Sequence, residues 1–237
     1  MSKAKVYLIP NFLGLEVTEN RSFPSENKEI IESLSHFAVE NIKEARRLLV
    51  RIGLKSKIDE SEFYNLDKKS DWDDIQPMIG ALKEGHSVGV ISDAGCPGIA
   101  DPGSLIVKHA HTNGFQSVPL IGPSSIFLAL MASGFNGQSF TFKGYLNRDS
   151  VIKSKEIREM ENLANQLQQT QIFMETPYRN EAMWEDLMKT LRGETKLCVA
   201  ANISLPNEYI KTKTVAEWKK SSKQNLDKMP AIYLLGS

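Results

Sequence analysis

The residues best suited to chemistry lie in one glycine-rich loop, 92–103, with the sequence Ser-Asp-Ala-Gly-Cys-Pro-Gly-Ile-Ala-Asp-Pro-Gly. It follows the apolar run 87–91 and precedes a helical pattern. Three glycines and two prolines are more than a chain reversal requires. Glycine lets backbone approach a ligand closely, and proline stiffens the loop so that binding costs less entropy. The loop therefore predicts a ligand site at the carboxyl end of a strand, with an ordinary long turn as the alternative.

Three further segments follow apolar strand patterns and carry groups that could line a site. They are 10–14 (Pro-Asn-Phe-Leu-Gly), 122–125 (Gly-Pro-Ser-Ser) and 175–179 (Glu-Thr-Pro-Tyr-Arg). The second opens a helix, whose free N–H groups and hydroxyls can hold polar or anionic groups. Arg179 suits a phosphate or a carboxylate, and a structural ion pair is the alternative. We expect the four segments to meet in a crevice between two α/β halves.

Several standard motifs are absent, which narrows the chemistry. The sequence has no GxGxxG, no GxxxxGK[ST], no HExxH, no EF-hand loop and no GxSxG. His109 and His111 are two residues apart on a predicted helix and point to different faces, so we expect no metal site. Cys96 and Cys198 are far apart in the sequence, and we expect neither a disulfide nor a zinc site.

Overall charge is balanced, with 29 basic and 29 acidic residues, whereas a nucleic-acid-binding domain is usually basic. Any basic surface must therefore be local. The best candidate is a set on and after one predicted helix, Lys43, Arg46, Arg47, Arg51, Lys55 and Lys57. Positions 43, 47 and 51 are four apart and share a helix face, and a solvated face is the alternative. A second basic group is typical of ordinary surface: Lys211, Lys213, Lys219, Lys220 and Lys223.

The composition is that of a soluble globular protein, with 41% hydrophobic and 24% charged residues in 237. No stretch approaches the roughly 18 consecutive apolar residues of a membrane span. The apolar run 6–9 near the N-terminus is too short for a signal peptide, so we expect no membrane association and a cytoplasmic location.

Strand and helix patterns alternate along nearly the whole chain. In the first half we expect strands at 5–9, 35–39, 87–92 and 116–121 and helices at 25–34, 41–52, 71–84 and 103–113, the helix over 41–52 being stopped by Gly53. This rhythm predicts a mainly parallel sheet covered by helices. In the second half we expect strands at 140–145, 170–175, 195–201, 207–213 and 230–235 and helices at 126–132, 149–169, 178–191 and 214–222. The fold class is α/β, with two α/β domains, 1–118 and 119–237.

The motifs resemble those of the tetrapyrrole methylase superfamily. Residues 92–103 resemble its Ser-Asp-Ala-Gly-Thr-Pro…Asp-Pro-Gly signature, and 118–125 resemble the Val-Pro-Leu-Pro-Gly-Pro-Ser segment of one branch. That branch contains the small-subunit ribosomal RNA cytidine-2′-O-methyltransferase. Residues 140–146 are similar to its Phe-x-Phe-x-Gly-Phe-Leu strand, and 173–179 to its Phe-Tyr-Glu-x-Pro-His-Arg motif. The resemblance covers nearly the whole chain, with the motifs in the same order.

The resemblance implies a homodimeric methyltransferase that binds S-adenosylmethionine in a cleft between two α/β domains. Carried over motif by motif, it implies that the first loop faces the cofactor through Asp93, Ala94, Gly95, Cys96 and Ile99. It further implies contacts from Ser124 and Ser125 to the methionine or ribose portion. The adenosine pocket would be lined near Met174, Ala201, Asn202 and Pro230.

Three segments depart from the family pattern on the side expected to bind substrate. Residues 10–14 replace the family's Pro-Thr-Pro-Ile-Gly, 39–43 (Val-Glu-Asn-Ile-Lys) replace Ala-Glu-Asp-Thr-Arg, and 200–204 (Ala-Ala-Asn-Ile-Ser) replace Ala-Arg-Glu-Leu-Thr. Cys96 stands in place of a Thr, which is a mild change. The cofactor side is therefore expected to be kept and the substrate side altered.

Methylation of a ribose hydroxyl benefits from a general base, because the hydroxyl is a poor nucleophile at neutral pH. Glu40 is the first candidate, with capping of the helix after it as the alternative; Glu175 and Arg179 complete the catalytic set. Three functions remain open. They are ribose 2′-O-methylation of ribosomal RNA in the small subunit, methylation of a small tetrapyrrole-like molecule, and a non-catalytic protein that binds S-adenosylmethionine.

Overall fold

The computed structural model describes residues 4–14, 23–67, 69–221 and 225–236. The chain divides into two compact units, Met1–Ser124 and Ser125–Ser237, each of which is considered separately below. Lys223 and the last residue of the helix expected over 214–222 lie outside the described residues. Among the described helices, none has the length and apolar character needed to cross a membrane.

Unit 1 is built on a five-stranded sheet with the order β3-β2-β4-β1-β5. Its strands are β1 (Lys5–Ile9), β2 (His36–Val39), β3 (Glu62–Asn65), β4 (Val88–Ile91) and β5 (Gln116–Pro119). Every neighbouring pair is parallel, which confirms the parallel sheet expected for this half. Strand β3 was not expected, because its Glu-Phe-Tyr-Asn sequence is short and has polar ends that match an ordinary loop.

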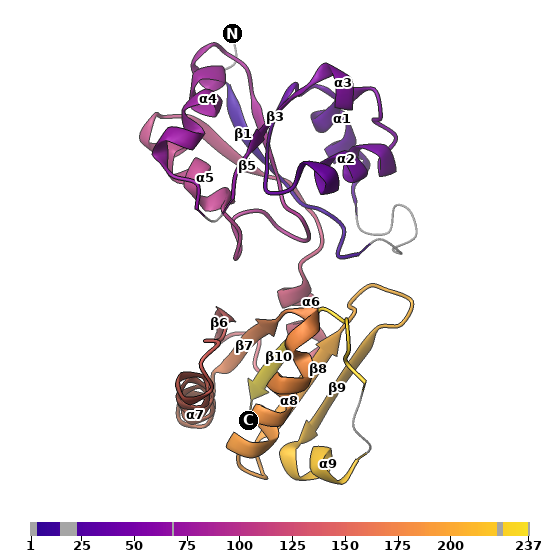
Figure 1. Cartoon of the computed structure of the whole chain (residues 1–237), viewed down its shortest axis with the longest axis vertical. Helices are drawn as coiled ribbons and strands as arrows, with labels where there is room; N and C mark the ends of the chain where they lie inside the picture. Colours follow the sequence, from indigo (N-terminus) through magenta and orange to yellow (C-terminus); the bar gives the residue numbers. More distant parts are fainter. Residues whose placement is uncertain (1–3, 15–22, 68, 222–224, 237) are drawn as a thin grey trace. The chain divides into compact units, whose positions relative to one another are not determined.

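Helices cover both faces of this sheet (Figure 1). They are α1 (Ser25–Glu32), α2 (Ile42–Arg51), α3 (Lys57–Glu60), α4 (Trp72–Lys83) and α5 (Gly103–Thr112). Alternate strand residues point to opposite faces. Val88 and Val90 therefore pack in the cluster beneath α4 and α5, whereas Phe37, Val39 and Ile91 pack with α1 and α2.

Helix α2 has a buried face, an exposed face and defined ends. The side chain of Asn41 caps its start by accepting the backbone N–H of Lys43 at 3.0 Å. Ala45, Leu48 and Leu49 are buried against the sheet. Gly53 follows the helix with φ of +76°, which confirms its expected role as the stop signal. The opposite face, with its basic residues, is left to solvent.

Unit 2 contains a mixed sheet with the order β6-β7-β10-β8-β9. Its strands are β6 (Phe140–Tyr145), β7 (Thr170–Glu175), β8 (Lys196–Ala201), β9 (Tyr209–Thr214) and β10 (Ala231–Gly236). Only β6 and β7 are parallel, and the other three pairings are antiparallel. This sheet therefore differs from that of unit 1, although the two halves share the alternation of strand and helix patterns.

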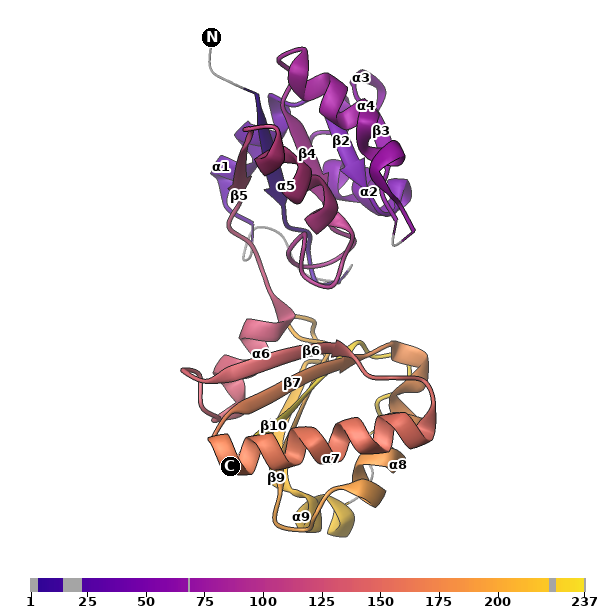
Figure 2. The same cartoon turned by 90° about the vertical axis from the view of Figure 1, so that its left-hand side faces the viewer.

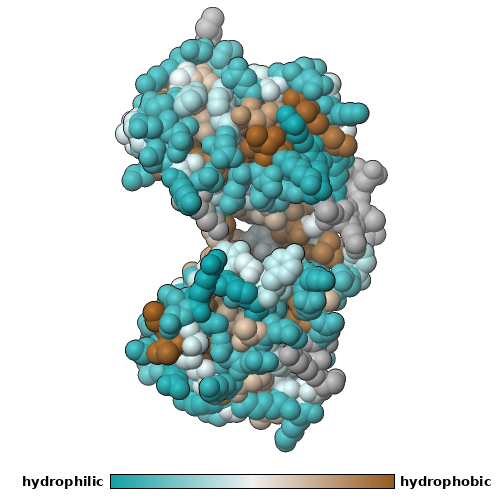
Figure 3. Space-filling model, in the orientation of Figure 1, coloured by the Kyte–Doolittle hydropathy of each residue, from teal (hydrophilic) through white to brown (hydrophobic). Residues whose placement is uncertain are grey.

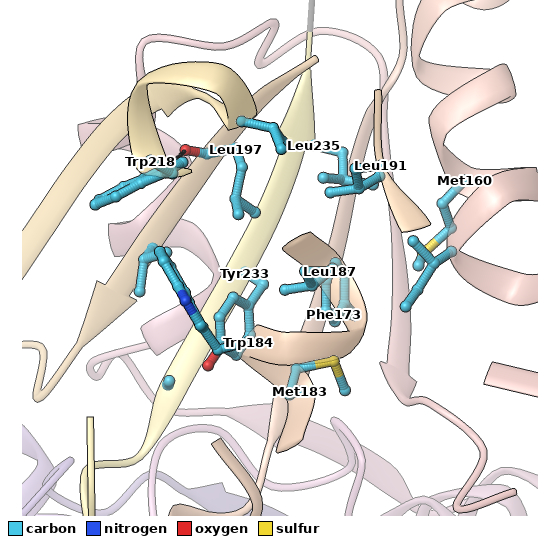
Figure 4. Close-up of a cluster of buried hydrophobic side chains, with 14 of the residues drawn as sticks. Met160, Phe173, Met183, Trp184, Leu187, Leu191, Leu197, Trp218, Tyr233 and Leu235 are labelled. Carbon is cyan, nitrogen blue, oxygen red and sulfur yellow. Dashed lines mark hydrogen bonds between the residues drawn. The ribbon is translucent and has the colours of Figure 1, made fainter. Parts of the chain in front are cut away.

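The helices of unit 2 also lie on both sheet faces (Figure 2). They are α6 (Ser125–Ser133), α7 (Ser150–Leu167), the short 3-10 turn η1 (Pro177–Arg179), α8 (Asn180–Thr190) and α9 (Val215–Lys220). Side chains from α7, α8 and α9 form one core with the sheet, in which Phe173 stacks on Tyr233 at 5.4 Å and Trp184 meets Trp218 edge-on at 5.3 Å (Figure 4). The elements expected for this half are confirmed, with ends that differ by a few residues.

Candidate functional site

The loop after β1 is joined to the glycine-rich loop after β4 by reciprocal backbone hydrogen bonds. The N–H of Asn11 donates to the carbonyl of Gly95 at 2.9 Å, and the N–H of Gly95 donates back to Asn11 at 3.0 Å. The Asn11 side-chain amide also donates to the carbonyl oxygens of Ser92 at 3.0 Å and Asp93 at 3.2 Å. Asn11 is buried, so it holds the two loops in a fixed relation.

The segment after β5 joins the same group of loops. The Cys96 thiol donates to the carbonyl of Pro123 at 3.5 Å. Gly122 lies against the Pro10 ring so closely that an added Cβ would stand 2.2 Å from the ring Cγ. The side-chain amide of Asn27, on α1, donates to the carbonyl of Ile121 at 2.8 Å. Three of the four segments singled out in the sequence therefore meet at the carboxyl ends of the strands of unit 1.

The glycine-rich loop has a preformed shape. One carboxylate oxygen of Asp101 accepts the backbone N–H groups of Gly98 at 2.5 Å and Gly103 at 2.8 Å. Gly95 and Gly98 adopt φ of +69° and +79°, a conformation that glycine reaches without steric cost. Within this fixed loop the apolar side chain of Ile99 is 52% exposed. The loop therefore presents an apolar contact surface to solvent beside its polar backbone.

Asp93 is a half-buried carboxylate that, among the described residues, pairs with no Lys, Arg or His. Its burial raises the pKa of the carboxyl above the usual range, and the nearby charges of Glu44 and Asp101 raise it further. A backbone hydrogen bond from Asn41 acts in the opposite direction. A half-buried acid of this kind is stabilised by a hydroxyl donor or a cationic group on a ligand.

Cys96 does not have the character of a nucleophile. Burial raises the pKa of its thiol, and the charge of Asp101 acts in the same direction. The thiol is therefore protonated at neutral pH and serves as a donor to the carbonyl of Pro123.

A cavity of about 200 Å³ lies beside Asp93 in unit 1. Its described lining comes from the loop after β1, from α2 and from the start of the glycine-rich loop: Asn11, Phe12, Leu13, Gly14, Glu44, Arg47, Leu48, Arg51, Asp93 and Ala94. The guanidinium of Arg51 lies 3.8 Å above the Phe12 ring and donates to the carbonyl of Gly14 at 2.9 Å. The volume is below the 300–1,000 Å³ of typical whole-ligand pockets, so the cavity fits a part of a ligand, such as one ring.

Glu40 follows β2 directly and is half-buried. The alternative of a helix cap is wrong, because Asn41 caps α2 and the helix begins at Ile42. Since the backbone of Asn41 reaches the Asp93 carboxylate, the end of β2 lies next to the glycine-rich loop. The structure therefore brings Glu40 to the neighbourhood of Asp93 within unit 1.

In unit 2 the residues expected to contact the cofactor lie together where the neighbouring strands β7, β10 and β8 begin or end. Ala231 pairs with both Glu175 and Ala201, because β10 runs antiparallel to β7 and β8. Asn202 follows Ala201 with φ of +50°, and its N–H donates to the carbonyl of Pro230 at 3.0 Å. Met174 lies one residue before Glu175 on β7 and completes this set.

Glu175 and Arg179 form an ion pair of 2.5 Å. The carboxylate is almost fully buried and also accepts the backbone N–H of Thr176 at 2.6 Å, whereas the Arg179 side chain is 32% exposed. The structure therefore shows the alternative expected for Arg179, a structural ion pair. Ser124 and Ser125 are half-buried and stand on either side of the division between the units, with Ser125 beginning α6.

Two features of this site were not identified from the sequence. One is the set of side-chain bonds of Asn11, whose partners lie more than 80 residues away. The other is the contribution of α2 to the cavity, where Glu44 pairs with Arg47 at 2.5 Å. The i,i+3 spacing of that pair was a usable signal. Among the described residues, no cluster of His, Cys, Asp and Glu could hold a metal ion.

Comparison with known proteins identifies a matching family and similar proteins in other organisms. The family model described as "Tetrapyrrole (Corrin/Porphyrin) Methylases" matches residues 30–219. A protein of Vibrio cholerae named "Ribosomal RNA small subunit methyltransferase I" is 30% identical over 214 residues, covering 90% of this chain and 69% of the relative. The protein of the same name from Bacillus subtilis is 30% identical over 213 residues, covering 90% and 68%.

Solved structures share the fold at low sequence identity. The methyltransferase CobJ superposes with a TM-score of 0.66 at 16% identity, covering 99% of this chain and 94% of the other. The uroporphyrin-III-C-methyltransferase of Thermus thermophilus gives 0.56 at 18% identity, covering 99% and 92%. The two-domain α/β fold expected from the sequence is confirmed.

Proposed function

Because this chain belongs to the tetrapyrrole methylase family and is a methyltransferase, we propose that it transfers the methyl group of S-adenosylmethionine to a ribose 2′ oxygen of small-subunit ribosomal RNA. The relatives at 30% identity carry the name of a small-subunit ribosomal RNA methyltransferase. A ribosomal substrate also implies that the protein acts in the cytoplasm.

The observation that carries the cofactor assignment is the glycine-rich loop with its half-buried acid. Asp93 lacks a basic partner among the described residues, and the adjacent Gly95 leaves backbone open to close approach. S-adenosylmethionine offers a sulfonium, an ammonium and ribose hydroxyls, which are the groups that such a carboxylate recognises. Ile99 supplies an exposed apolar contact in the same loop.

We carry the expected cofactor contacts over to each unit from its own motifs. In unit 1 we assign Asp93, Ala94, Gly95, Cys96 and Ile99, with Ser124 at the end of that unit and Ser125, the first residue of α6 in unit 2, for the methionine or ribose portion. In unit 2 we assign Met174, Ala201, Asn202 and Pro230; a backbone hydrogen bond joins Asn202 to Pro230.

When bound, S-adenosylmethionine supplies a methyl group on a sulfonium, from which the sulfur departs easily. The protein then has to orient the acceptor, exclude water and take the proton of the hydroxyl. We assign the proton to the Glu40 carboxylate, which stands beside the glycine-rich loop. We assign to Glu175 and Arg179 a positioning role, because their ion pair holds the turn after β7.

The test is calorimetric titration with S-adenosylmethionine of the wild type and of two variants, Asp93→Ala and Gly95→Asp. We expect binding by the wild type and none by either variant, while circular dichroism shows that both remain folded. Retained affinity in both variants would overturn the pocket assignment. Saturable binding of the wild type without methylation of ribosomal RNA would favour a small tetrapyrrole-like acceptor or a non-catalytic protein.

From the family resemblance we also propose that the protein is a homodimer. Sedimentation at micromolar concentration tests this directly, since a dimer has twice the 26.6 kDa mass of the chain. A single species of monomer mass would overturn it.

A further inference from the structure

The exposed face of α2 concentrates positive charge. Lys43, Arg46 and Arg47 are exposed along it, and Arg51 continues the same face one turn later. Glu44 is the one acid within α2, and it pairs with Arg47. Among the described residues, no acid lies within ion-pairing distance of Lys43 or Arg46. Since the chain as a whole has zero formal charge, this face is a local basic surface.

The same face is a groove with apolar surface between the cations. The described lining residues are Ile42, Lys43, Arg46, Arg47, Val50 and Arg51. Val50 is 51% exposed. Figure 3 shows hydrophobic and hydrophilic surface side by side over α2. Ile42 and Val50 therefore give this face an apolar strip in addition to its positive charge.

Two of the cations lie over aromatic rings. The Arg46 guanidinium lies 5.8 Å from the Phe63 ring centroid, and that of Arg51 lies 3.8 Å from the Phe12 ring centroid. Basic side chains that follow a backbone, combined with apolar and planar groups for bases, are the features by which proteins hold single-stranded nucleic acid. Duplex recognition rests mainly on contacts to phosphate and sugar and makes less use of an apolar strip.

The groove leads to the proposed methyl-transfer site. Arg47 and Arg51 line both the groove on α2 and the cavity beside Asp93. The lining of that cavity also includes Asp93 and Ala94 of the glycine-rich loop. A strand lying along α2 would therefore pass one of its nucleotides directly to the cavity, which is large enough for a single ring.

We propose that the exposed face of α2 binds the single-stranded RNA segment that flanks the methylated nucleotide, with phosphates on Lys43, Arg46 and Arg47 and bases on the strip of Ile42 and Val50. This inference rests on the proposed function and adds the surface that recognises the substrate. The RNA strand is held through its charge and through stacking, so the groove accepts many sequences. The nucleotide to be methylated is selected at the cavity.

The test compares two double variants that each remove two positive charges. Lys43→Ala/Arg46→Ala changes the groove, and Lys219→Ala/Lys220→Ala changes exposed lysines of α9 in unit 2. Fluorescence anisotropy with a single-stranded RNA oligonucleotide at several salt concentrations gives the affinity and its salt slope. Calorimetry with S-adenosylmethionine and methyl transfer to small ribosomal subunits are measured on the same preparations.

We expect the groove variant to bind RNA at least tenfold more weakly, with a log–log salt slope smaller by about 0.7 for each lost phosphate contact. Its KM for ribosomal subunits rises, while its affinity for S-adenosylmethionine stays that of the wild type. The α9 variant matches the wild type in all three measurements. Equal RNA affinity and KM in both variants, with an active wild type, would overturn the groove and leave the proposed function standing. A wild type that methylates no RNA would overturn the proposed function instead.

Discussion

Asn11 and Gly95 exchange two backbone hydrogen bonds, of 2.9 and 3.0 Å, across loops that are 84 positions apart in the chain. This antiparallel bridge lies beyond the last parallel pair of β1 and β4, Ile9 with Ile91. It makes the loop after β1 part of the same rigid body as the glycine-rich loop. The proposed cofactor site therefore depends on a residue outside the recognised motif.

Asn11→Asp is expected to weaken both the site and the fold. The side-chain amide that donates to the carbonyls of Ser92 and Asp93 becomes an acceptor facing acceptors. We expect a loss of about 1–3 kcal/mol in the free energy of unfolding and a marked loss of affinity for S-adenosylmethionine, measured by urea denaturation and calorimetry. Asn225→Asp is the control, because toward the described residues the Asn225 side chain bonds through its oxygen, which accepts the N–H of Asp227. Equal behaviour of the two variants would contradict the account.

Comparing Gly95→Ala with Gly53→Ala distinguishes the effect of backbone strain inside the proposed site from its effect elsewhere in the fold. Gly95 has φ of +69° and Gly53, at the end of α2, has φ of +76°. An alanine in this conformation costs about 1–2 kcal/mol at either position. We expect both variants to lose similar stability in urea, but only Gly95→Ala to lose affinity for S-adenosylmethionine. The assignment fails if the two variants bind the cofactor equally well.

Asp93→Asn is expected to raise stability at neutral pH and to weaken cofactor binding. Burial raises the folded-state pKa of Asp93, so the folded protein holds this proton more tightly than the unfolded chain. That contribution to stability is complete below the usual carboxyl pKa of about 3.9 and is lost as the pH rises through the folded-state pKa.

At pH 7 the asparagine variant avoids the cost of burying a carboxylate and should unfold at higher urea concentration than the wild type. The difference should shrink when both are compared at pH 4. A variant less stable than the wild type at pH 7 would contradict this electrostatic description of Asp93.

Glu40→Gln is expected to reduce methyl transfer without affecting cofactor binding. Loss of a general base lowers kcat by about 10²–10⁴-fold, while the affinity for S-adenosylmethionine and the urea midpoint should stay near the wild-type values. Single-turnover kinetics with small ribosomal subunits checks this. An unchanged kcat would remove Glu40 from the mechanism.

Glu175→Gln is expected to act on stability rather than on the chemical step. The substitution breaks the ion pair with Arg179 in which the carboxylate is almost fully buried. We expect a loss of about 1–3 kcal/mol in the free energy of unfolding, with kcat of the folded protein within a few-fold of the wild type. Glu194→Gln, at an exposed carboxylate 3.7 Å from Arg192, serves as the control and should change neither quantity. A fall in kcat as large as that of Glu40→Gln would make Glu175 catalytic.

The sequence predicted those parts of the structure that depend on local pattern. The apolar run before Ser92 and the glycines after it placed the main loop at the end of a strand, and Gly53 marked the end of α2. The direction of β10 was not predictable in this way, because alternation along a strand is the same in parallel and antiparallel pairs. Its antiparallel course is what brings Ala231 beside both Glu175 and Ala201.

The details of the site were less predictable, since they depend on partners distant in the chain. Nothing near Asn11 indicates that its amide bonds to the carbonyls of Ser92 and Asp93. The spacing of Glu175 and Arg179 suited both an ion pair and a ligand site, and only the structure distinguished them. The altered segments at 10–14 and 39–43 now lie beside the glycine-rich loop, so they remain the first place to look for a change in substrate.

The most direct test of the central claim is transfer of a labelled methyl group from S-adenosylmethionine to small ribosomal subunits that lack the modification. After the reaction the RNA is digested to nucleosides and the labelled product is identified. The account predicts label in a 2′-O-methylated ribonucleoside, with none formed by Asp93→Ala. Tight binding of S-adenosylmethionine by the wild type, with no label in RNA, would contradict it.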